Sequence, residues 1–159
     1  MFKRSVILCT LLASSTMFAT ESESVASANQ MQLMLTAITK KYDQAVLKKY
    51  EEKIENAFRS YLYDCIADET KIKNIHEIEK AAKELLGYLI IVGERDEAYS
   101  ATSMIFILSW TKIINELAKT ITTEKEVENL QEATDLIRDL VEKMFLEPMN
   151  EMIEEEEEN

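Results

Sequence analysis

Hydrophobic residues recur every three or four positions over most of the chain, which is the spacing of one face of an α-helix. The longest such stripe begins at Met31 and reaches Cys65 with no glycine or proline inside it. One continuous helix there would be about 54 Å long, whereas the later stripes predict helices of about 30 to 38 Å. The first helix is therefore expected to break around Lys48 to Glu52, where polar residues crowd the stripe, or to extend beyond its neighbours.

An extended first helix would leave its N-terminal hydrophobic face uncovered. Exposed apolar patches of this kind mark protein interaction surfaces. We therefore predict a candidate interaction surface on the first half of this helix, which would also serve as the seam of a homodimer. Its residues are Met31, Met34, Leu35, Ile38 and Tyr42.

The segment from Met104 to Trp110, continuing to Leu117, is apolar on nearly all sides. A soluble protein can contain such a helix only if other helices bury it. The apolar run ends at Lys112 and is shorter than the roughly 20 residues of a membrane span. It predicts the central helix of a bundle, over residues 96–120.

Two further amphipathic stripes predict helices over residues 75–92 and 123–147. Thr123 and Glu126 have the spacing of a capping box, which fixes the start of the last helix. Pro148 is expected to end that helix, so residues 148–159 are predicted to form an acidic, disordered tail.

The glycines at 87 and 93 have separate interpretations. Gly93 follows the second stripe and suits the residue just after a helix C-terminus. Gly87 lies inside that helix, where it indicates either a close approach of another helix, beneath Trp110, or a tolerated weak position.

Short links between the last three helices favour antiparallel neighbours. The chain has only two glycines and one proline, so it lacks the turn residues that strands need. The sequence predicts an all-α, up-and-down antiparallel bundle of four helices, or five if the first one breaks, over residues 31–147.

The N-terminus resembles a secretory signal peptide. Lys3 and Arg4 precede an apolar stretch that ends at Ala19. We predict a signal peptide over residues 1–19, with a retained anchor as the alternative, then a flexible lead-in over 20–30. The mature protein would be exported, periplasmic or secreted, and would keep Cys65 as a single free thiol after losing Cys9.

The chain is strongly acidic, with 30 acidic and 18 basic residues and a net charge of −12. Loss of Lys3 and Arg4 would leave 16 basic residues and a net charge of −14. Such a field repels nucleic acid and anionic membranes and attracts cationic partners. The alternative interpretation is that the charge only keeps an exported protein soluble.

No catalytic or cofactor motif stands out. His76 is the only histidine, so neither a zinc site nor a di-iron site has its usual ligands. The end of the first helix and the start of the second are expected to lie close together, so a Cys65–His76 pair is a candidate nucleophile and base. We expect no metal, no cofactor and no stable membrane span after signal removal.

These features predict an exported, acidic helical-bundle protein that acts by binding another protein and has no catalysis of its own. An adaptor, an inhibitor or immunity-type protein, a chaperone and a secreted effector all fit this class. The first alternative is a membrane-active protein that inserts its hydrophobic third helix. The second alternative is an enzyme that uses the Cys65–His76 pair or surface carboxylates.

Overall fold

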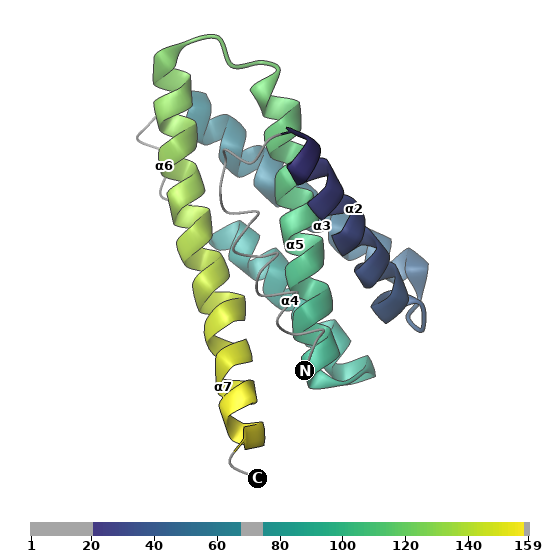
Figure 1. Cartoon of the computed structure of the whole chain (residues 1–159). Coiled ribbons are helices and arrows are strands. Elements are labelled where there is room, and N and C mark those ends of the chain that lie inside the picture. The colour runs from purple at the N-terminus through teal and green to yellow at the C-terminus, as the bar shows by residue number, and fades with distance from the viewer. Residues whose placement is uncertain (1–20, 68–74, 158–159) are drawn as a thin grey trace.

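The computed structural model describes residues 21–67 and 75–157, and over these residues the chain is an all-α bundle without strands (Figure 1). It contains five helices when the last three elements are counted as one continuous helix, which confirms the predicted fold class. The elements are α2 (Glu21–Thr39), α3 (Gln44–Ala67), α4 (His76–Val92), α5 (Arg95–Ala118), α6 (Glu124–Val141), the π-helix η2 (Glu142–Leu146) and α7 (Glu147–Glu157). The predicted signal peptide at 1–19 lies outside the described residues.

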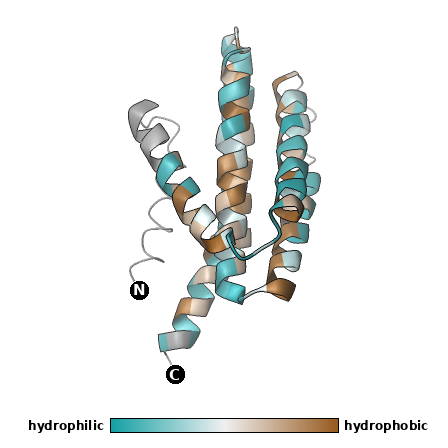
Figure 2. Cartoon of the chain, turned by 90° about the vertical axis from the view of Figure 1, so that its right-hand side faces the viewer, coloured by the Kyte–Doolittle hydropathy of each residue, from teal (hydrophilic) through white to brown (hydrophobic). Residues whose placement is uncertain are grey.

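Helix α5 is the centre of the bundle, as its apolar sequence predicts. It packs against α2 on one side and against α3 and α4 on the other (Figure 2). Met104, Ile113 and Leu117 are almost fully buried. Some of its buried small polar side chains bond to the backbone of the helix itself. The Thr102 hydroxyl, for example, donates to the carbonyl of Ala98 at 2.7 Å. Burial of these hydrophobic side chains is the main source of stability in such a bundle.

An aromatic cluster ties three elements together through α5. Phe106 meets Phe58 of α3 edge-to-face, with ring centroids 4.8 Å apart, and meets Phe145 of η2 at 5.4 Å. Trp110 lies 5.5 Å from Phe58. Phe58, Phe106 and Phe145 are completely buried, so each makes the large contribution expected of an enclosed aromatic ring.

The first predicted helix breaks between Thr39 and Gln44, earlier than the Lys48 to Glu52 region that we expected. Asp43 causes the break because its carboxylate accepts the backbone N–H groups of Ala45 at 2.9 Å and Val46 at 3.2 Å, and so caps the start of α3. The Gln44 amide donates to the carbonyl of Thr39 at 2.8 Å and closes the end of α2. The extended first helix is therefore a wrong prediction.

The predicted lead-in also differs from the structure. Residues 21–30 belong to α2, which begins at Glu21. Further along α2, Met31 and Leu35 are buried in the core. Residues 21–30 are therefore helical where we expected a flexible lead-in.

The C-terminal helix continues past Pro148, which corrects two predictions at once. The N–H of Glu147 donates to the carbonyl of Glu142, five residues back, so the helix widens into a π-turn just before the proline. A widened turn relieves the clash between a proline ring and the preceding turn of the helix. Residues 148–157 are helical rather than a disordered tail, and Met149 and Met152 are buried.

The two glycines also differ from their simplest interpretations. Gly93 has an extended backbone, with φ −147° and ψ −163°, so no left-handed turn requires a glycine there. The reason is contact: a Cβ at Gly93 would lie 2.0 Å from the Tyr42 hydroxyl. A Cβ at Gly87 would meet nothing within 4 Å, so Gly87 is the tolerated weak position and not a site of close approach.

Candidate functional site

The five residues of the predicted interaction surface lie together on α2 and the turn that follows it, but they do not form an exposed patch. Met31, Leu35 and Tyr42 are buried, and Met34 and Ile38 are half-buried against the core. The face they form packs against α5. A hydrophobic stripe alone cannot distinguish a partner's surface from the chain's own core, and here the core is what covers it.

The predicted Cys65–His76 pair has opposite environments for its two members. Cys65 is fully buried, and burial raises the pKa of its thiol, an effect that the neighbouring Tyr61 hydroxyl opposes only in part. A raised pKa disfavours the reactive thiolate. The side chain of His76 is 78% exposed and faces Glu79 at 3.7 Å. These environments do not match an activated nucleophile and its base.

The most distinctive surface of the described structure is the outer face of the last helix. Residues 124–157 carry 13 acidic and three basic side chains, a formal charge of −10 out of −12 for the whole chain. The acids recur every three or four residues and are exposed along one side of α6 and into η2. We call this the acidic stripe, and its residues are Glu124, Glu128, Glu132, Asp135, Asp139 and Glu142.

Among the residues that the structure describes, few cations neutralise the acidic stripe. Arg138 pairs with Asp135 at 3.0 Å, and Lys125 approaches Glu128 at 3.9 Å. Like charges four residues apart destabilise a helix by about 0.2–0.5 kcal/mol per pair. Exposed carboxylates in α7, such as Glu147, Glu151 and Glu154, extend the negative surface.

Ion pairs elsewhere in the described structure link different helices. Lys112 of α5 donates to both carboxylate oxygens of Glu55 of α3 at 2.8 Å, and this bond raises the pKa of Lys112. Lys53 pairs with Glu84, and Lys41 with Glu97. Arg59 reaches Glu116 at 3.2 Å. Most of these acids therefore have a structural role, in contrast to those of the acidic stripe.

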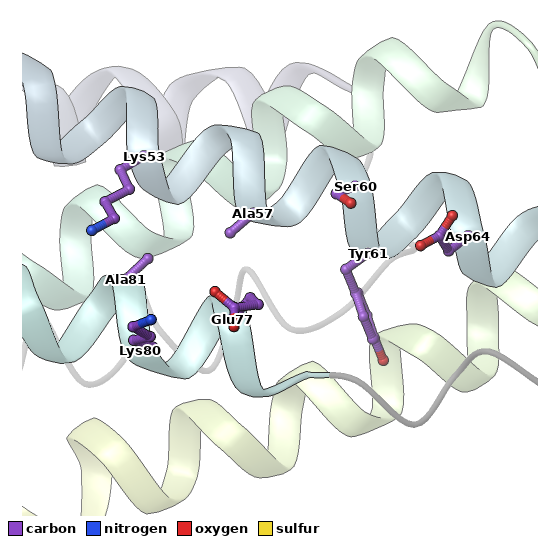
Figure 3. Close-up of a pocket in the computed structure, with 8 residues that line it drawn as sticks. All are labelled: Lys53, Ala57, Ser60, Tyr61, Asp64, Glu77, Lys80 and Ala81. Atoms are coloured by element: carbon purple, nitrogen blue, oxygen red, sulfur yellow. The ribbon is translucent and has the colours of Figure 1, made fainter.

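A pocket of about 290 Å³ lies between α3 and α4 (Figure 3). Helix α3 lines it with five residues, which are Lys53, Ala57, Ser60, Tyr61 and Asp64. Helix α4 lines it with Glu77, Lys80 and Ala81. We call it the α3–α4 pocket. Our sequence interpretation missed it, because it depends on which faces of two helices meet across the bundle.

Within residues 21–67 and 75–157, none of the helices has the length and hydrophobicity of a membrane span. In the same two ranges, no three His, Cys, Asp and Glu side chains are grouped so that they could hold a metal ion.

Comparison with protein families, curated proteins and solved structures gives no match for this chain. Its function therefore has to be inferred from the geometry and chemistry of its own residues.

Proposed function

We propose that the protein is exported and acts by binding another protein, whose basic surface docks on the acidic stripe. The observation that carries the proposal is the concentration of exposed, weakly neutralised carboxylates on one helix. This location replaces the buried face of α2 as the candidate binding surface.

Three features support a docking role over a merely solubilising one. The charge is not spread over the surface, since residues outside 124–157 have nearly balanced charges. The stripe is continuous, because α6 contacts α3, stands at the edge of the bundle and runs without a break into η2 (Figure 1). Its like charges oppose one another in the free protein, and a cationic partner would remove that repulsion.

A charge-matched pair of variants tests the proposal. The stripe variant Glu128→Gln/Glu132→Gln/Asp139→Asn and the control variant Glu52→Gln/Glu94→Gln/Glu116→Gln lose the same net charge. Binding to a lysine-rich helical peptide is measured by titration calorimetry at low and at near-physiological salt.

We expect the stripe variant to bind about tenfold more weakly than the wild type, since three exposed charge pairs of about 0.5 kcal/mol each sum to about 1.5 kcal/mol, and about 1.4 kcal/mol corresponds to a factor of ten. The control variant should bind nearly as the wild type does. Equal losses in both variants would mean that net charge alone attracts the peptide, and the proposal would fail.

A further inference from the structure

The α3–α4 pocket lies on a different part of the molecule from the acidic stripe and has a different character. Its walls include two small side chains, Ala57 of α3 and Ala81 of α4, and these leave space between helices that are otherwise in contact. The buried side chain of Tyr61 adds an aromatic wall. At about 290 Å³ the pocket is near the lower end of ligand-binding cavities, which indicates a ligand of metabolite size.

The charges that line the pocket are balanced and separated. Figure 3 shows Lys53 and Lys80 at one end, Asp64 at the other end and Glu77 between them. Two cations and two anions give a formal charge of zero, in a chain whose net charge is −12. Lys53 and Asp64 are eleven residues apart on α3, or about 16 Å at 1.5 Å per residue.

The charged side chains of the pocket differ in their partners. Lys53 pairs with Glu84, and Glu84 also attracts Lys80 electrostatically. Among residues 21–67 and 75–157, the side chains of Lys80, Asp64 and Glu77 form no hydrogen bond and no ion pair. A ligand with a carboxylate at one end and an ammonium at the other would give each of them a partner of opposite charge.

We propose that the α3–α4 pocket binds a short peptide with free termini, two or three residues long. Its C-terminal carboxylate lies by Lys80, and its N-terminal ammonium lies between Glu77 and Asp64. An extended peptide spans about 3.3–3.6 Å per residue, so three residues fit within the charged length of the pocket. The small side chains of the peptide pack on Ala57, Ala81 and the ring of Tyr61.

The test uses trialanine as the probe and the full chain as the receptor. Amide chemical shifts are followed by NMR during a titration with trialanine, and again with trialanine that is acetylated and amidated. We expect saturable shifts around Ala57, Tyr61 and Ala81 with the free peptide, and at least fivefold weaker binding of the blocked peptide, which lacks both charges.

Two lysine substitutions on the surface test where the peptide binds. Lys80→Met should weaken trialanine binding about fivefold or more, whereas Lys49→Met, an exposed lysine of α3 outside the pocket, should leave it unchanged. The proposal is overturned if trialanine shifts no pocket amide, if the blocked peptide binds equally well, or if both lysine variants behave alike. The acidic stripe is intact in both variants, so neither result bears on partner docking.

Discussion

Gly87 weakens helix α4, and no neighbouring atom requires a glycine at this position. A glycine in a helix interior destabilises it by about 0.5–1 kcal/mol relative to alanine. Because no atom lies within 4 Å of the position of a new Cβ, we predict that Gly87→Ala raises the free energy of unfolding by that amount. Urea denaturation followed by circular dichroism measures it, and a loss of stability would show that the site is more crowded than described.

The glycine at 93 should respond in the opposite direction. Gly93→Ala would force its methyl group against the Tyr42 ring, which is buried, so we predict destabilisation of about 1–3 kcal/mol. Tyr42→Phe removes the nearest atom, and it sacrifices no hydrogen bond because the hydroxyl has no partner among the described residues. A double-mutant cycle should therefore show that Tyr42→Phe partly relieves Gly93→Ala. Strict additivity would contradict the contact.

At the scale of single helices, the caps decide where the elements begin. Asp43 holds the first turn of α3 as Thr123 holds that of α6, where Thr123 accepts the N–H of Glu126 at 3.2 Å. We predict that Asp43→Ala destabilises the protein by about 1 kcal/mol, which is typical for the loss of an N-cap. Urea denaturation gives the value, and Asp64→Ala, an exposed position inside α3, is the control.

The Thr123 cap should also make stability depend on pH. Backbone N–H groups of Thr122 and Thr123 donate to the Glu126 carboxylate, both at 2.9 Å, and hold its pKa below the ordinary 4.5. A lowered pKa in the folded state gives stability that is present above 4.5 and is lost as the pH falls through the folded value. Glu126→Gln should therefore be less stable than the wild type at neutral pH, and this difference should shrink in acid.

The difference between these two proteins is the informative quantity, because other groups titrate in the same range. Partial desolvation, together with the nearby Glu55 carboxylate, raises the pKa of Glu51, so this group contributes stability at low pH that is lost as the pH rises. Unfolding curves of both proteins from neutral to acidic pH test the prediction. A gap that stays constant with pH would exclude an ionised cap.

The sequence predicted the helices and the burial of α5 because hydrophobic spacing reports directly on which side chains avoid water. The capping box at Thr123 and Glu126 was predicted and is confirmed. The break at Asp43 was missed because the hydrophobic stripe continues through Tyr42, whose ring packs on Gly93, the residue just after α4. The signal available was an Asp followed by a helical stripe, which is a common N-cap pattern.

The candidate sites were harder to predict than the fold. Carboxylates at helical spacing are visible in the sequence, but a solubilising role explains them as well as a binding role does. The structure separates them from acids that form ion pairs between helices, such as Glu55 with Lys112. Whether Met31 and Leu35 meet a partner or the chain's own core depends on the path of α2. The α3–α4 pocket depends on Ala57 and Ala81 facing each other, which is a tertiary relation.

For the whole molecule, the crowded charges on one edge predict an unusual response to salt. Screening weakens repulsion along the exposed stripe more than it weakens the Glu55–Lys112 pair, whose carboxylate is buried. We therefore predict that added sodium chloride stabilises the wild type, and that the stripe variant with Glu128, Glu132 and Asp139 neutralised is more stable at low salt and less responsive to salt. Thermal melts of both proteins across a salt series test this. Salt-induced destabilisation of the wild type would indicate that its ion pairs outweigh the repulsion.

The π-turn at Glu142–Leu146 determines which side of α7 faces the bundle. One extra residue in a turn rotates the following helix by about 100°, and this rotation brings Met149 and Met152 to the inside. Removing one residue, such as the exposed Lys143, would turn carboxylates inward and methionines outward over the last three turns. In this segment a deletion should lower the stability far more than almost any substitution. Natural variants are therefore expected to keep the length of the segment while their residues differ.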